Sequence, residues 1–188
     1  NYIWNANSGL AFWALAAVGD DPEADKLLVE VRQRFNERMF PAMEYLNGLP
    51  GDAMGYWYLY CFSPGVWTLL AAQSACEADL IGKVKKDQGD WLSRQFDNLM
   101  ISTLPNMRHL PWGDIQDGPD GGVSHEMAGT IDAAARAMGS PTGAYFSAWL
   151  AGKRGLSRFY GESVIGYFLY ARNLNVKPVA PSFLAMHA

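Results

Sequence analysis

Hydrophobic residues recur along the chain at the spacing of helices, in segments that differ in how many of their sides are apolar. Between Trp4 and Val18 apolar residues fall on nearly every side, which is typical of a helix packed by neighbours on several faces. Between Pro22 and Met39 they recur every three or four residues among charged ones, which predicts an amphipathic helix. Pro41 is expected to bend or end this helix, and Asn47-Gly48 to close it.

The same alternation of more apolar and more amphipathic segments continues to the end of the chain. Pro64-Gly65 is expected to interrupt the chain before a new helix begins at Val66. Helices are predicted over residues 66–80, 91–104, 125–138, 142–150 and 159–172, loops over 82–89 and 105–122, and an extended segment over 178–188. No strand pattern precedes this last segment. The sequence therefore predicts an all-α fold of antiparallel helical hairpins over residues 1–175, followed by an extended tail over 176–188.

The stretch from Leu49 to Thr68 concentrates aromatic side chains behind a Pro-Gly-Asp turn, with Asp52 placed as a helix N-cap. Its aromatic residues Tyr56, Trp57, Tyr58 and Tyr60 fall within five positions. Each buried phenol needs a hydrogen-bond partner, so we expect some of them to face a wet cavity. A sugar-binding or catalytic wall and an aromatic core segment both remain open.

Composition narrows the class of protein. The 188 residues are enough for one domain or a piece of a larger one, and 49% are hydrophobic, so a sizeable core is expected. The net charge of −4 argues against a nucleic-acid partner. No apolar run reaches about 18 residues, so no membrane span is expected. Two cysteines, Cys61 and Cys76, make neither a disulfide framework nor a zinc site. The chain begins without Met, so we expect a trimmed or incomplete piece.

Several segments, in order, resemble the helical domain of heparinase II/III-like polysaccharide lyases. The Asn-Trp-Asn segment of that family is similar to residues 4–10, which an Ala-rich helix and Asp-Asp-Pro follow here. Its Asp-Gly...Glu-Gly-x-x-Tyr segment is similar to residues 51–58, its Pro-x-Gly-Asp loop to residues 110–114, and its exit into a β-sandwich to residues 166–170 and 178–184. The chain departs from the family in two places: Met54 stands where Glu is usual, and the chain stops where the sandwich would begin.

This resemblance implies an architecture, partners and a location. The fold would be an incomplete (α/α) toroid, the C-terminal part of the family's helical domain. Its missing neighbours would leave apolar faces uncovered, so a homo-oligomer is expected. The partner would be an acidic polysaccharide or oligosaccharide, with no cofactor and no metal. The full-length protein would be periplasmic or extracellular.

The resemblance also implies β-elimination on a uronic-acid glycan. A donor neutralises the uronate carboxylate, a base removes the C5 proton, and an acid protonates the leaving oxygen. Asn5 or Asn7 would be the carboxylate donor, Tyr58 the acid/base residue, and His125 a second donor or base. Trp4, Tyr56, Trp57, Tyr60 and Trp112 would contact the sugar. Each residue also has a structural interpretation: helix N-caps for the asparagines, an interfacial aromatic for Tyr58, and a surface residue at a helix start for His125.

Two other classes of function stay open. An (α/α) toroid glycoside hydrolase would use paired carboxylates, Asp114 or Asp117 with Glu126. A non-catalytic scaffold would only stack sugars on its aromatic residues. The products separate the three: a lyase makes a 4,5-unsaturated uronate, a hydrolase cleaves the glycan without making it, and a scaffold makes no product. Asp114, Asp117 and Asp120 could also bind a hard cation, although a loop held by Asx-turns is preferred. His109 and His187 are weaker candidates for a functional residue than His125.

Overall fold

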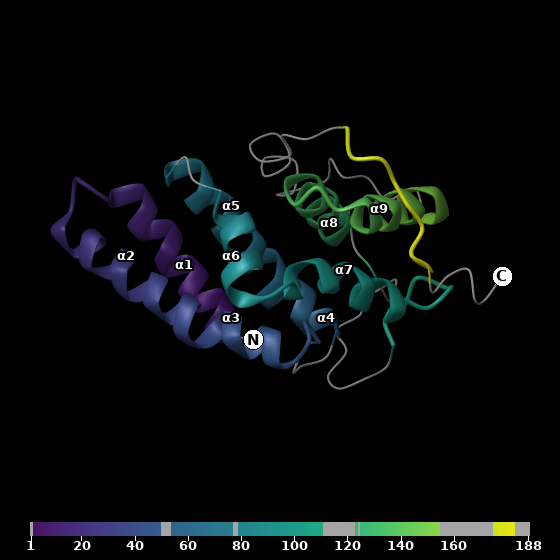
Figure 1. Cartoon of the computed structure of the whole chain (residues 1–188), viewed down its shortest axis with the longest axis horizontal. Coiled ribbons are helices and arrows are strands. Elements are labelled where there is room, and N and C mark those ends of the chain that lie inside the picture. Colours follow the sequence, from purple (N-terminus) through teal and green to yellow (C-terminus); the bar gives the residue numbers. More distant parts are fainter. Residues whose placement is uncertain are drawn as a thin grey trace.

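The computed structural model describes residues 2–49, 54–76, 79–110, 123, 125–154 and 175–182 (Figure 1). The elements in these ranges are α1 (Tyr2–Ala17), α2 (Pro22–Arg34), η1 (Phe35–Met39), α3 (Phe40–Tyr45), α4 (Met54–Trp57), η2 (Tyr58–Phe62), α5 (Ser63–Cys76), α6 (Leu80–Gln88), α7 (Trp91–Ile101), α8 (His125–Ala137) and α9 (Pro141–Arg154). An isolated bridge between Thr103 and His109 is the only β pairing among the described residues. The predicted all-α fold is confirmed.

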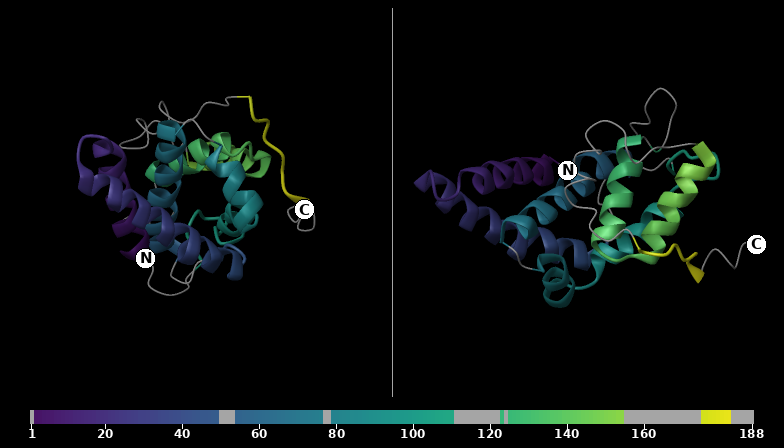
Figure 2. Two further views of the ribbon diagram at one scale, coloured as in Figure 1. Left: turned by 60° about the vertical axis from the view of Figure 1, so that its left-hand side comes forward. Right: turned by 90° about the horizontal axis from the view of Figure 1, so that it is seen from above.

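Helical hairpins lie at both ends of the molecule. The α1–α2 hairpin forms one end and the α8–α9 hairpin the other, as Figures 1 and 2 show. The middle helix α5 contacts both α1 and α8, so it connects the two hairpins through packing. The hydrophobic core is continuous across these contacts and includes Phe35, Phe40, Trp57, Trp91, Phe96, Phe146 and Leu150. The predicted helix over residues 159–172 lies outside the described residues.

Two prolines lie inside continuous helical segments, each preceded by a π-helical turn. Turn η1 ends two residues before Pro41, and turn η2 ends two residues before Pro64. Proline lacks an N–H and clashes with the carbonyl four residues earlier, and a wider turn at that place relieves both problems. The predicted interruption at Pro64-Gly65 is therefore wrong: helical backbone runs from Met54 to Cys76. At Pro41 the helix widens and continues to Tyr45.

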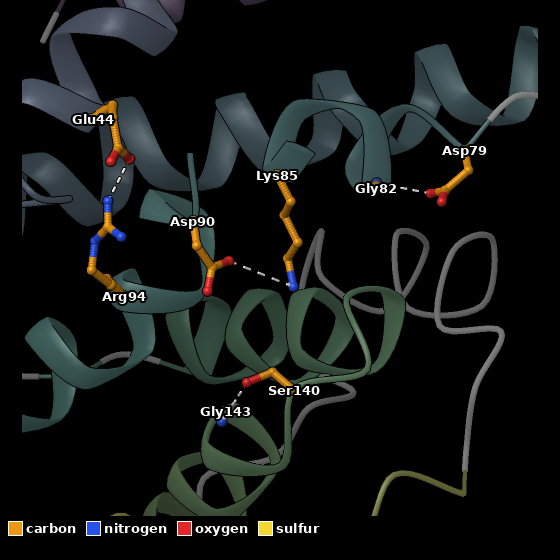
Figure 3. A network of polar contacts seen from close by, with 8 residues as sticks. All are labelled: Glu44, Asp79, Gly82, Lys85, Asp90, Arg94, Ser140 and Gly143. Atoms are coloured by element: carbon orange, nitrogen blue, oxygen red, sulfur yellow. Dashed lines mark hydrogen bonds and ion pairs between the residues drawn. The ribbon is translucent and has the colours of Figure 1, made fainter. Parts of the chain in front are cut away.

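Residues 82–89 were expected to form a charged loop, and this expectation is wrong because Leu80–Gln88 forms helix α6. The backbone N–H of Gly82 donates a hydrogen bond to Asp79 Oδ1 at 2.9 Å, which caps the helix (Figure 3). Ile81 and Val84 are buried. The lysines that suggested a loop lie on the remaining faces of a short amphipathic helix.

Polar contacts connect α7 to α3 and to α6 (Figure 3). Arg94 on α7 forms an ion pair and hydrogen bond with Glu44 on α3. Lys85 Nζ on α6 lies 3.9 Å from Asp90 Oδ1, at the start of α7. These contacts are partly exposed, so each contributes at most about 1 kcal/mol to stability. They join α7 to its neighbours at the surface, while the buried face of α7 completes the core.

Asp97 on α7 gives a test of the electrostatics of this helix. Burial, and secondly repulsion by Asp90, raise the pKa of its carboxyl above 3.8. The native state therefore binds this proton more readily than the unfolded chain, and stability falls as the pH rises through the native pKa. We expect Asp97→Asn to raise the free energy of unfolding slightly at pH 7, and the gain to shrink below about pH 4. Urea unfolding at both pH values measures this.

Asp20→Asn, at an exposed turn position, is the control for loss of one negative charge. It should change stability little at either pH. A lower stability of Asp97→Asn at pH 7 would contradict the electrostatic explanation.

Candidate functional site

The N-terminal turns of α1 and the aromatic segment α4–η2 lie against each other. The ring centroids of Trp4 and Trp57 are 5.9 Å apart, and those of Tyr2 and Tyr60 are 6.3 Å apart. Tyr56 and Tyr60, one turn apart, are in contact with their rings tilted by 36° and their centroids 5.3 Å apart. The resemblance implies that these two segments meet, and these contacts bring them together. Trp4 and Trp57 are 53 residues apart in sequence, so only the tertiary fold could place the two segments side by side.

Trp4 lies at the centre of an aromatic cluster beneath this junction. Besides Trp57, its ring contacts Phe35, Phe40 and Trp91, at centroid distances of 5.7, 6.4 and 6.2 Å. Gly65 on α5 leaves room for the same ring, since a Cβ there would lie 3.1 Å from it. Trp4 is only partly buried, yet most of its contacts are with the core. Its position is that of a core residue at the base of the site.

Trp57 is buried at the end of α4, and hydrogen bonds connect it through α7 to the turn after α3. It is only 5% exposed, and its indole Nε1–H donates a hydrogen bond to Gln95 Oε1 at 2.8 Å. The Gln95 amide nitrogen in turn donates to the carbonyl of Gly48, which has φ of 73°. The sequence analysis did not single out Gln95. A signal was present, because a glutamine in the apolar stripe of an amphipathic helix needs a buried partner.

The two candidate asparagines differ in how much of their amide is free. Asn7 is buried; its Nδ2 donates to the carbonyl of Ile3 at 2.7 Å, and its Oδ1 accepts from Arg34 Nη1 at 3.1 Å. Arg34 also pairs with Glu30 on α2. Asn5 is exposed on the outer side of the same helix. Of the two amides, that of Asn5 is therefore the better placed to meet a ligand.

The tyrosines of the segment lie partly at the surface. Tyr56 and Tyr60 are half-buried, which agrees with the expectation that some of these phenols meet water. Tyr58 is the first residue of η2. Its backbone is described, but its side chain lies outside the described part of the structure. Its π-helical turn widens the backbone at this place, and π turns occur frequently at functional sites.

The remaining candidates are placed only in part or not at all. Trp112, Asp114, Asp117, Asp120 and His187 lie outside the described residues. His125 and Glu126 begin α8, and their side chains are outside the described part. His109 is 2% exposed, so it is a buried residue of the α7–α8 connection.

A cavity of about 550 Å³ lies elsewhere in the molecule, between the α1–α2 hairpin and helices α5 and α6. Its walls are mainly apolar and include Leu15, Leu28, Leu69 and Val84. None of the predicted site residues whose side chains the structure describes lines it. In the part of the chain that the structure describes, no helix is long and apolar enough to cross a membrane, and no three His, Cys, Asp or Glu side chains gather as metal ligands.

Comparison of the chain with protein-family models, with curated proteins and with solved structures gives no match.

Proposed function

We propose that this chain is part of the helical toroid of a heparinase II/III-like polysaccharide lyase, which cleaves a uronic-acid glycan by β-elimination. The observation that carries the proposal is the junction of α1 with α4–η2. Two segments that resemble the family, residues 4–10 and 51–58, contact each other there, with the ring centroids of Trp4 and Trp57 5.9 Å apart. Hairpins at both ends of the described part agree with an incomplete toroid.

The side chains at this junction suit distinct roles. Asn5 is the proposed donor to the uronate carboxylate, because its amide is exposed whereas that of Asn7 is bonded to Ile3 and Arg34. The half-buried pair of Tyr56 and Tyr60, whose rings are in contact at an interplanar angle of 36°, offers aromatic surface for a sugar ring. Trp57 is buried and hydrogen-bonded, so its role is to support this aromatic surface from beneath.

Tyr58 is the proposed acid/base residue, from its match to the family's tyrosine. A tyrosine has a pKa of about 10 in water, so it needs help to remove the C5 proton at neutral pH. Neutralising the substrate carboxylate by hydrogen bonds from Asn5 would acidify that proton and lower the barrier. The same phenol could then protonate the leaving glycosidic oxygen. His125 and Trp112 remain candidates for a second donor and a sugar contact.

Tyr58→Phe tests this assignment in a polypeptide that carries the helical segment together with the sandwich that the resemblance implies. We expect the rate of elimination to fall by about 10²–10⁴-fold, with oligouronate binding nearly unchanged, because only the titratable oxygen is removed. The ultraviolet absorbance of the unsaturated product measures the rate. In the isolated chain we expect little or no turnover.

Tyr60→Phe is the matched control, since it removes a phenol oxygen from the same π-helical turn and keeps the ring that contacts Tyr56. It should retain elimination close to the wild-type rate. Wild-type rates in Tyr58→Phe would refute the acid/base role.

A non-catalytic glycan-binding scaffold is the second candidate, favoured by the half-buried pair of Tyr56 and Tyr60. It predicts oligouronate binding with no unsaturated product in any context. We propose a periplasmic or extracellular location for the full-length protein, as the resemblance implies.

A further inference from the structure

Helix α1 is apolar on its outer side as well as on its buried side. It contains no charged residue from Tyr2 to Ala17. Its buried residues are Asn7, Ser8, Ala11 and Ala14, whereas Tyr2, Ile3, Leu10, Phe12 and Trp13 are 70, 68, 37, 39 and 47% exposed. A surface helix normally presents polar residues on its outer face. The helix lies along an outer edge of the molecule (Figure 2, right), so no described element covers this face.

Four of the outward residues form a single line along the helix. Ile3, Ala6, Leu10 and Trp13 are spaced by three, four and three residues, the spacing at which two packed helices present side chains to each other. All four are exposed. We call this line the α1 seam. At about 100° per residue, Asn5 and Phe12 lie roughly a third of a turn or more away from its centre.

We propose that the α1 seam is the binding site for a second copy of this chain, with α1 packed against α1 about a two-fold axis. In such an interface each surface meets itself, so like charges would face each other if the surface carried any. The seam carries none. The ion pair of Arg34 with Glu30 lies beside it, on α2, and presents both signs of charge. Ala6, near the middle of the seam, lets the two backbones approach closely.

The exposed area of the α1 seam indicates how tightly two copies would associate. Ile3, Leu10 and Trp13, with Tyr2 at the flank, expose on the order of 400 Å² in each copy, given about 150–250 Å² for a whole aromatic side chain. Two copies would then bury about 800 Å² in total, two thirds of the roughly 1,200 Å² at which standard-size interfaces begin. The association is therefore expected in the micromolar range or weaker, and it depends on concentration.

Sedimentation equilibrium of the wild-type chain and two glutamate variants tests the proposal. The wild type should pass from monomer to dimer as the concentration rises through the micromolar range. Trp13→Glu places a charge in the seam of both copies and should raise the dissociation constant at least about 10-fold. Phe12→Glu is the matched control: it changes the neighbouring aromatic, of similar exposure, on a different side of the same helix. It should dimerise as the wild type does.

The outcomes separate this proposal from its alternatives. A wild type that stays monomeric at all concentrations overturns it, whether or not the protein binds lipid vesicles. Equal dimerisation of the wild type and Trp13→Glu overturns it too, because the copies would then meet elsewhere. Circular dichroism of both variants confirms that they fold. The assay contains no glycan, so its result does not depend on the proposed lyase function. Trp13→Glu should still bind oligouronate if Asn5 and the tyrosines hold it.

Discussion

Trp4→Ala is expected to lower the free energy of unfolding by about 3–5 kcal/mol, the cost of removing a large aromatic side chain from a packed core. The indole contacts Phe35, Phe40, Trp57 and Trp91 at once, so no single neighbour can move to fill the space. Chemical denaturation followed by circular dichroism measures the loss. The result bears on function, because a tryptophan used mainly to stack a sugar would lose binding without a comparable loss of stability.

Phe12→Ala is the matched control for this experiment. Phe12 lies on the same helix, 39% exposed, and is absent from the core cluster. Its replacement should change stability by no more than about 0.5 kcal/mol, as for most surface substitutions. Similar losses in the two variants would show that α1 is sensitive to any change, and would contradict a special role for Trp4 in the core.

Gln95→Leu is expected to cost about 2–4 kcal/mol, although leucine is apolar and similar in size. The substitution leaves two buried groups without partners, the indole N–H of Trp57 and the carbonyl of Gly48. Each unsatisfied buried group costs about 1–3 kcal/mol. The loss should appear in thermal and urea unfolding alike. Adding Trp57→Phe should cost less than the two single changes predict together, because it removes one of the unpaired groups.

Asn98→Leu is the control on the same helix. The Asn98 side chain donates to the carbonyl of Asn47 at 3.3 Å, next to the Gly48 carbonyl but exposed to solvent. Water can replace that bond, so we expect a loss well below that of Gln95→Leu. Equal costs for the two substitutions would mean that burial does not set the value of these bonds.

The hydrophobic pattern determined the class of fold. The apolar spacing predicted α1, α2, α7, α8 and α9, because a helix in a compact domain must bury one stripe and the sequence records that stripe directly. The pattern failed where local chemistry suggested a break. Lysines in α6 and the proline-glycine pair at the start of α5 both argued for a loop, but packing of Ile81 and Val84 and a π-helical turn kept these segments helical.

For the candidate site, the sequence determined residue types but not their surroundings. It singled out Asn5, Asn7, Trp57 and their neighbours, and could not tell an exposed amide from a buried one. Asn5 and Asn7 are two residues apart, about 200° around the helix, so a neighbouring helix decides which is covered. Only the fold brought Arg34 to Asn7 and Gln95 to Trp57, across 27 and 38 residues. Contacts between distant segments depend on how helices pack, and no local pattern of hydrophobic residues records that.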